Sequence, residues 1–331
     1  MTEKYSHADH TPRRPPIDAE LIPAMQAMKT LLPTISHETL DEFREVMANG
    51  LPGQEPDDYT AAGKVLVEEL VIPGSEPGLE LAMTVLKPAD GSGPWPLIYH
   101  THGGGMVLGT RFTGFSQFIP YAADGSAVVA SIEYRLAPEN PDPAPITDCY
   151  TGLVWLARNA AALDVDPDHI IITGGSAGGG LAAGTALMAR DRGFPRLTHQ
   201  ILNQPMLDDR LHTHSARMLD REGIWDRHDN LFGWVGLLGE RRGTDDVSYY
   251  AAPARAQDLT DLPRTFIDVG SVESFRDEAV EYAMRLSQAG VSVDLHVWGG
   301  GVHGFDTFPQ SALSQAATAT RDEYFRRALE R

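Results

Sequence analysis

The chain has 331 residues, of which 42% are hydrophobic and 22% are charged. This length suits one large α/β domain or two smaller domains, and the composition excludes fibrous, coiled-coil and wholly disordered proteins. The formal net charge of −19 repels phosphate backbones and anionic lipid headgroups. We therefore expect a globular protein that binds neither nucleic acid nor a membrane surface.

The cysteine count and the N-terminal residues indicate the cellular compartment. Cys149 is the single cysteine, so it forms no disulfide within the chain and supplies no thiolate cluster for a metal. Residues 1–16 carry charges and prolines where a secretory signal has an apolar core. No apolar stretch approaches the roughly 20 residues that a membrane-spanning helix needs. These features predict a cytoplasmic protein.

In chain order, the first predicted element is an amphipathic helical segment at residues 17–49. It precedes every strand-like run and does not fit the pattern that follows. We assign residues 1–60 to N-terminal cap helices and a linker, and residues 61–331 to the main α/β domain.

Eight short β-rich runs follow, most of them bounded by Gly, Pro or Asp. They lie at residues 64–72, 79–87, 96–101, 127–133, 169–173, 199–203, 264–269 and 291–298. The first two runs are joined without a helix, which predicts an antiparallel hairpin at the edge of a sheet. Apolar residues at three- and four-residue spacing predict helices at residues 146–161, 178–190, 276–289 and 310–329. This alternation predicts a mostly parallel eight-stranded sheet with helices on both faces, whose reactive groups gather at the carboxyl ends of the strands.

Residues 208–240 break the alternation, since they show no strand pattern but carry many large apolar side chains. These side chains are Met218, Leu219, Ile224, Trp225, Leu231, Phe232 and Trp234. We interpret the segment, extended to about residue 245, as an inserted lid over the sheet. Its aromatic and apolar side chains either pack as a helical core or line a substrate pocket, and both interpretations stay open.

The strongest local motif is Gly-Gly-Ser-Ala-Gly at residues 174–178, directly after a predicted strand and directly before a predicted helix. Glycines on both sides of a serine permit the sharp turn that lifts the hydroxyl clear of the sheet. Ser176 is therefore the candidate nucleophile. A Gly-rich turn whose serine merely caps the helix is the alternative, and the neighbouring motifs decide between the two.

A second motif, His-Gly-Gly-Gly at residues 102–105, follows the third predicted strand. Glycines there let main-chain N–H groups point into a site, as in an oxyanion hole, and the amide of Ala177 is the expected second donor. A phosphate loop is a poor alternative, because Thr110 and Arg111 stand where that motif requires Lys and Ser or Thr.

The candidate base is His303, which lies on the loop after the last predicted strand and can take a proton from Ser176. A literal G-x-G-x-x-G also occurs at residues 299–304, but no later strand closes a βαβ unit, so we reject dinucleotide binding.

The acid that orients the imidazole is expected between the serine and the histidine in the chain. The candidates after the seventh strand are Asp268, Glu273, Asp277 and Glu278. Asp268 falls inside the strand, whereas Asp277 and Glu278 fall in the following helix. Glu273, on the loop, is the preferred acid, and Asp277 is its main rival.

Together these motifs resemble the hormone-sensitive-lipase-like family of α/β-hydrolases, as found in bacterial carboxylesterases. The resemblance runs from about residue 94 to the C-terminus and rests on residues 102–105, 134–139, 174–178, 276–278 and 303–305. It implies the α/β-hydrolase fold with a helical cap, a Ser176–Glu273–His303 triad, and esters with small or medium acyl groups as substrates. It also implies an oxyanion hole, supported by His102 and built from Gly103, Gly104, Gly105 and Ala177. Family analogy suggests a homodimer.

Three residues depart from the pattern of the family. Gly175 replaces the usual Asp before the nucleophile, Met106 stands where an aromatic residue is common, and Glu273 takes a position where Asp predominates. No reacting group is lost, so the departures bear on acyl preference and on the identity of the acid. We expect Met106, Met218 and Trp225 to line the substrate pocket.

The sequence thus predicts a serine carboxylesterase that works through an acyl-enzyme and needs no metal or organic cofactor. His212 and His214 lack the carboxylates or thiolates that would complete a metal site. Cleavage of an amide, lactone or carbamate, or transfer to an alcohol, remains an alternative because the same triad serves each reaction. A receptor that keeps the fold without catalysis is a further alternative.

Overall fold

A computed structural model of the chain describes residues 11–32, 34–49 and 57–330. Within them, eight strands form one sheet in the order β1-β2-β4-β3-β5-β6-β7-β8. The strands are β1 (Val65–Pro73), β2 (Glu80–Pro88), β3 (Trp95–Thr101), β4 (Val128–Ile132), β5 (Val165–Gly175), β6 (His199–Asn203), β7 (Arg264–Val272) and β8 (Val293–Val302). β2 runs antiparallel to β1 and β4, and the other neighbours are parallel. The predicted sheet and its edge hairpin are confirmed.

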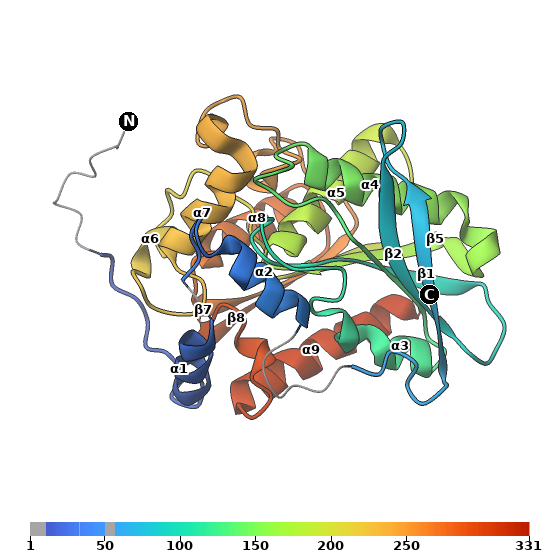
Figure 1. The fold of residues 1–331 in the computed structure, drawn as a ribbon, viewed down its shortest axis with the longest axis horizontal. Helices are drawn as coiled ribbons and strands as arrows, with labels where there is room; N and C mark the ends of the chain where they lie inside the picture. The colour runs from blue at the N-terminus through green and yellow to red at the C-terminus, as the bar shows by residue number, and fades with distance from the viewer. Residues whose placement is uncertain (1–10, 33, 50–56, 331) are drawn as a thin grey trace.

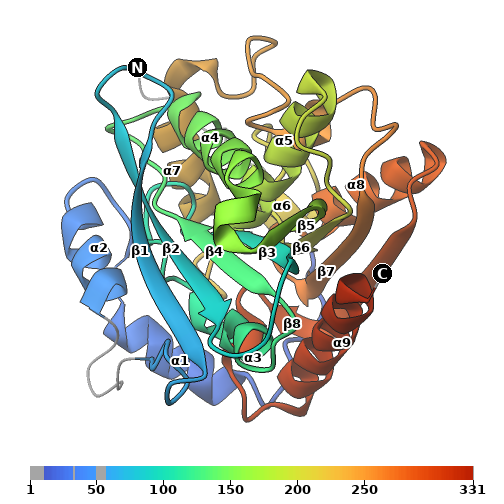
Figure 2. The same ribbon diagram turned by 90° about the vertical axis from the view of Figure 1, so that its right-hand side faces the viewer.

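Helices cover both faces of the sheet (Figures 1 and 2). One face carries α4 (Ala144–Arg158), α5 (Ala177–Arg192) and α8 (Arg276–Gln288), and the other carries α3 (Ile119–Ala123) and α9 (Ala312–Leu329). The long helices match their predicted positions. α3 was not predicted, since five residues are too few to show a helical period.

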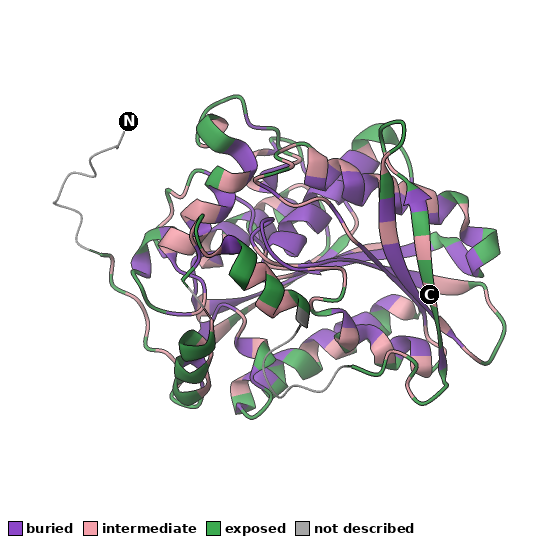
Figure 3. Cartoon of the chain, in the orientation of Figure 1, coloured by how far each residue is buried: buried purple, intermediate pink, exposed green. Residues whose placement is uncertain are grey.

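Side chains of the central strands alternate between two cores, as the period of a strand requires. Tyr99 of β3 and Ile172 of β5 belong to the core beneath α4, α5 and α8. Their neighbours Ile98 and Ile171 point to the opposite core, beneath α3 and α9. The central strands are therefore buried on both faces, whereas the outer faces of α1 and α2 and the edge strand β1 are largely exposed (Figure 3).

Two strands are longer than predicted, and one of them, β8, is extended toward the site. β5 begins at Val165, since the Asp and Pro that follow it do not end the strand. β8 continues through the glycines at residues 299–301 to Val302, which pairs with Val272 of β7. From the sequence, the three glycines at residues 299–301 indicate the end of the strand. In the structure they are part of β8, which ends directly before His303.

The predicted helical segment at residues 17–49 consists of two helices, α1 (Ile22–Leu31) and α2 (Leu40–Asn49). Leu32 is extended, as expected of a residue that precedes a proline. Residues 1–10 and 50–56 of the predicted cap and linker lie outside the described part of the chain.

The insertion after β6 holds the short α6 (Ser215–Met218) and α7 (Arg227–Leu238). A third apolar cluster joins α1 to α6 and to the carboxyl ends of β7 and β8, and it includes Leu21, Met218, Val272 and Val302. In Figure 1, α1, α6 and α7 accordingly lie toward the same end of the sheet. Every helix in the described ranges is too short or too polar to span a bilayer.

Candidate active site

Ser176 lies between β5 and α5 with φ 58° and ψ −125°, a backbone conformation that residues other than glycine rarely adopt. A Cβ atom at Gly174 would lie 2.4 Å from the carbonyl carbon of Gly178, and one at Gly178 would lie 2.0 Å from the carbonyl oxygen of Thr101. Both glycines of the motif are therefore required by close packing. The amide of Ser176 donates to the carbonyl oxygen of Asn203 (2.8 Å), which ties the turn to β6.

The structure brings His303 and Glu273 to this serine. Nε2 of His303 lies 2.9 Å from Oγ of Ser176, and its Nδ1 lies 3.2 Å from Oε1 of Glu273. The amide of Gly270 donates to the other carboxylate oxygen of Glu273 (2.8 Å). The edge of Phe275 packs against the imidazole, with ring centroids 5.0 Å apart. Contacts on every side thus fix the imidazole between its two partners.

Glu273 is fully buried. Burial raises the pKa of this carboxyl group, while the hydrogen bonds from His303 and from the amide of Gly270 act to lower it. A buried carboxylate depends on such partners, because leaving water disfavours its charged form. A protonated imidazole at His303 would in turn be stabilised by this carboxylate.

The other acidic candidates have different partners. The carboxylate of Asp277 accepts from Nε of Arg276 and from the amide of Ser215, both at 2.8 Å. Asp268 pairs with Arg321 at 3.0 Å. Of the four candidates, Glu273 is the one that reaches His303.

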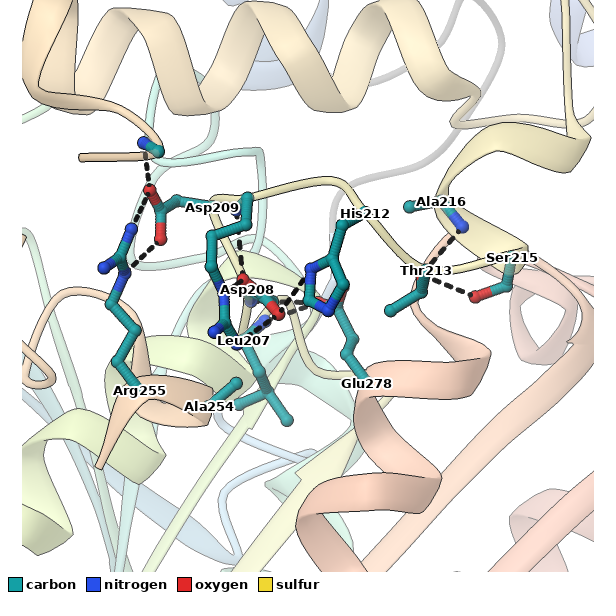
Figure 4. A network of polar contacts seen from close by, with 12 residues as sticks. Leu207, Asp208, Asp209, His212, Thr213, Ser215, Ala216, Ala254, Arg255 and Glu278 are labelled. Carbon is teal, nitrogen blue, oxygen red and sulfur yellow. Dashed lines mark hydrogen bonds and ion pairs between the residues drawn. The ribbon is translucent and has the colours of Figure 1, made fainter. Parts of the chain in front are cut away.

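Glu278, the fourth candidate, anchors the start of the insertion (Figure 4). Its Oε1 accepts from the amides of Leu207 (2.7 Å) and Asp208 (3.2 Å). Next to them, Arg255 holds the buried carboxylate of Asp209 through two contacts of 2.6 and 2.9 Å. These contacts fix the point where the chain leaves β6 and rises over the sheet.

The glycine run after β3 lies beside the serine. A Cβ atom at Gly103 would lie 3.4 Å from Cβ of Ser176. Gly104 and Gly105 have φ of 118° and 61°, and a Cβ atom at Gly104 would lie 2.2 Å from the carbonyl oxygen of Leu108. Within the described residues, the amides of Gly104, Gly105 and Ala177 donate no hydrogen bond. These N–H groups are free to bind an oxygen atom next to Ser176.

The side chain of His102 supports the glycine run through a contact with its backbone. Its Nδ1 lies 2.8 Å from the carbonyl oxygen of Gly103, and its ring stacks on Tyr134 with centroids 4.1 Å apart. The hydroxyl of Tyr134 donates to the carbonyl oxygen of His102 (2.9 Å). Burial lowers the pKa of His102 to about 4. A neutral imidazole with its proton on Nδ1 therefore fixes the glycine run.

Arg44 on α2 is a second support of the loop and was not predicted from the sequence. Its Nε donates to the carbonyl oxygen of Val107 and its Nη2 to that of Ala137, both at 2.9 Å. Two further contacts of 2.8 Å join the guanidinium to Glu139. No local signal marks Arg44, because a charged residue on an amphipathic helix is by default exposed to solvent.

A cavity of about 220 Å³ lies between α1, α2 and residues 221–229. Trp225 is one of its walls, and the ring of Trp225 also packs against Gly105, where it would approach a Cβ atom to 2.5 Å. Met106 lies instead in the main core, and Met218 lies in the cluster beneath α1. Of the three predicted pocket residues, Trp225 is the one that borders this cavity. Ile35 and Phe43 line it from the N-terminal side and were not predicted.

The strand order, the serine turn and the glycine run define the α/β-hydrolase class, and comparison with known proteins agrees. A family model described as alpha/beta hydrolase fold matches residues 98–307. Carboxylesterase NlhH of Mycobacterium tuberculosis is 38% identical over 239 residues, which cover 68% of this chain and 70% of that protein. The solved structure of a bacterial heroin esterase superposes with a TM-score of 0.86 at 37% identity, covering 95% of this chain and 98% of that one.

Esterase LipW from Mycobacterium marinum superposes with a TM-score of 0.81 at 31% identity, covering 96% of this chain and 99% of that structure. The chain therefore belongs to the hormone-sensitive-lipase-like family of α/β-hydrolases, a family of carboxylic ester hydrolases. The resemblance noted in the sequence is confirmed.

Proposed function

We propose that the chain is a serine carboxylesterase in which Ser176 is the nucleophile, His303 the general base and Glu273 the orienting acid. One observation carries this proposal: Glu273, His303 and Ser176 form a continuous hydrogen-bonded chain that ends beside free backbone amides. Nucleophile, base, orienting group and oxyanion donors in that mutual geometry are the parts that acyl transfer needs.

In the first half-reaction, Oγ of Ser176 attacks the carbonyl carbon of the ester while its proton moves to Nε2 of His303. The carbonyl oxygen becomes an oxyanion, which accepts hydrogen bonds from the amides of Ala177 and of the glycine run at residues 103–105. As the intermediate collapses, the bond to the alcohol oxygen breaks and His303 protonates the leaving alkoxide. The acyl group then remains on Ser176.

Water completes the second half-reaction. Its proton moves to His303 as its oxygen attacks the acyl carbon, and the released Oγ of Ser176 recovers that proton from Nε2. Throughout, Glu273 stabilises the imidazolium that forms twice in each turnover. Apart from the ester and the water molecule, every group that takes part in these steps belongs to the chain.

The substrate range is inferred from the cavity that Trp225 borders, since the ring of Trp225 also packs against Gly105 of the glycine run. We infer that α1, α2, α6 and α7 form the cap, and that the cavity of about 220 Å³ beside Trp225 receives one part of the ester. Its lining mixes apolar side chains, among them Ile35, Phe43 and Trp225, with charged ones such as Lys29 and Asp229, and its small volume favours a small to medium acyl group over a long chain.

A chain-length series of aryl esters, from acetyl to palmitoyl, tests the proposal with wild-type protein and Ser176→Ala. We expect the highest kcat/KM for short and medium acyl groups and loss of turnover in the variant. Anilides of the same acids and alcohol acceptors, run in parallel, measure amide cleavage and acyl transfer. Full ester hydrolysis by Ser176→Ala would overturn the proposed mechanism.

A further inference from the structure

A buried polar network beside the serine and the histidine is not used by the steps above. It begins at Gln204, directly after β6, whose φ of 48° lies in the left-handed region. The amide of Gln204 donates to the carbonyl oxygen of Asp268 (2.7 Å), and the residue is almost fully buried. Such a backbone persists where the surrounding structure over-determines it, most often at functional sites.

The side chain of Gln204 spans the loop that carries His303. Its Oε1 accepts from the amide of Gly304, the residue that follows the histidine, and its Nε2 donates to Oδ1 of Asp306 (3.0 Å). A primary amide offers an acceptor and a donor at once, whereas a carboxylate or an ammonium offers one kind alone. Glutamine therefore suits this pair of contacts by its chemistry.

Asp306 is held from the other side as well. Its Oδ2 accepts from Nη1 of Arg321 (3.0 Å) and from Nδ2 of Asn203 (2.9 Å). Nη2 of Arg321 continues to Asp268 (3.0 Å) and to Oδ1 of Asn203 (3.1 Å). The single positive charge of Arg321 thus lies between the carboxylates of Asp268 and Asp306. This arrangement makes the network rigid, because removal of one partner leaves a charge buried and unpaired.

Two consecutive residues now connect the two reacting groups. The carbonyl oxygen of Asn203 accepts from the amide of Ser176, and the side chain of Gln204 holds the backbone next to His303. The end of β6 therefore fixes the serine turn and the histidine loop to a common support. The distance between the serine turn and the histidine loop determines the 2.9 Å contact between Nε2 of His303 and Oγ of Ser176.

We propose that Gln204 is a positioning residue, which holds the His303 loop in register with Ser176 through Gly304 and Asp306. This inference rests on the proposed function, since it assumes that His303 is the base. Misplacement of a reacting group by about 1 Å lowers a rate by about a hundredfold. Loss of the contact should therefore lower kcat with little effect on KM, since Gln204 is almost fully buried and offers little surface to substrate.

The test compares Gln204→Met with Gln200→Met. Gln200 is buried on β6, the strand that ends directly before Gln204, and its Nε2 donates to Thr265 (2.9 Å) toward the other end of that strand. We expect kcat to fall about ten- to a hundredfold in Gln204→Met, with KM little changed, and to stay at the wild-type value in Gln200→Met. Thermal unfolding of both variants measures the purely structural effect.

The low-field proton resonance of Nδ1 in His303, which reports its hydrogen bond to Glu273, supplies a second readout. We expect it to shift or broaden in Gln204→Met and to stay unchanged in Gln200→Met. Should the methionine variant fail to fold, Gln204→Glu carries the test, because it keeps the oxygen that faces Gly304 and loses the donor to Asp306.

A wild-type kcat and resonance in the Gln204 variants would overturn the inference, as would an equal loss in Gln200→Met. Ser176→Ala separates this outcome from failure of the proposed function. If that variant is inactive while Gln204 proves dispensable, the mechanism stands and the positioning role falls. If Ser176→Ala stays active, the mechanism itself falls.

Discussion

Ser176 owes its position to its backbone rather than to the choice of a rotamer. Its carbonyl oxygen accepts from the amides of Met206 (3.0 Å) and Gly180 (3.1 Å), and its own amide binds β6. Hydrogen bonds to the peptide groups on both sides of this residue hold φ at +58°, where an ordinary residue is strained. We therefore expect the hydroxyl of Ser176 to occupy its reactive position before substrate binds.

The identity of the acid is tested by Glu273→Gln, with Asp277→Asn as the matched control. The amide side chain removes the negative charge beside Nδ1 of His303 and can favour the wrong tautomer. We expect kcat to fall about 10³–10⁴-fold in Glu273→Gln. Asp277→Asn should keep its activity, since Asp277 contacts Arg276 and Ser215. Steady-state kinetics with one aryl ester decides, and the reverse pattern would make Asp277 the acid.

Gly104→Ala tests the oxyanion donors. The added methyl group would lie 2.2 Å from the carbonyl oxygen of Leu108, so the loop must shift and its N–H groups move away from the serine. Loss of one such donor lowers kcat by about 10²–10³-fold. Gly125→Ala is the control, because Gly125 also has a positive φ but has open space around it. Equal activity of both variants would refute the role of the loop.

At the scale of elements, the glycine run is held between parts that are distant in the chain. α7 approaches it so closely that a Cβ atom at Gly233 would lie 2.8 Å from the carbonyl oxygen of Gly105. From α2, Arg44 reaches the carbonyl oxygen of Val107. The helices that border the cavity thus also contact the glycine run, so we expect substrate binding in the cavity to affect the geometry of the proposed oxyanion hole.

Arg44→Met should lower kcat several-fold, because the carbonyl oxygens of Val107 and Ala137 lose their donor and the loop gains freedom. Glu139→Gln removes the ion pair but leaves both of those contacts in place. Glu139 is about half exposed, and ion pairs of that kind contribute roughly 0–1 kcal/mol to stability. We therefore expect near wild-type kcat and thermal stability in Glu139→Gln. If Arg44→Met and Glu139→Gln had identical kcat values, the contacts of Arg44 with Val107 and Ala137 would not contribute to catalysis.

At the scale of the whole molecule, the two cores enclose histidines that must stay neutral. Burial lowers the pKa of His100 to about 3 and that of His102 to about 4, against an ordinary value near 6.5. The unfolded chain binds these protons more readily. Their contribution to stability is therefore complete above pH 6.5 and is lost as the pH falls toward 4.

His100→Asn isolates this effect. Buried carboxyls act in the opposite direction, as Asp229 does with a pKa raised by burial to about 6, so the informative quantity is the difference between two proteins. Relative to the variant, the wild type should lose about 1.4 kcal/mol of unfolding free energy per pH unit between pH 6.5 and 4. Urea unfolding at several pH values measures it. A difference that does not change with pH would contradict the assigned burial of His100.

Local sequence patterns were sufficient to predict the sheet and the three side chains, Ser176, Glu273 and His303, that the structure brings together. Continuous apolar runs marked the buried strands, and the close packing of Gly174 and Gly178 is the physical reason why the serine motif is recognisable. The supporting residues leave no such pattern, because their partners are far away in the chain. Arg44 binds a loop 63 residues on, and Arg321 binds Asn203 across 118 residues. Neither contact could be predicted without the fold.

The central claim is that the hydroxyl of Ser176 is the nucleophile. A fluorophosphonate probe followed by peptide mass mapping tests it most directly, with Ser176→Ala as the control. We expect one covalent adduct per chain on Ser176, loss of esterase activity in proportion to labelling, and no adduct in the variant. An unlabelled wild-type protein that still hydrolyses esters, or an adduct on another residue, would contradict it.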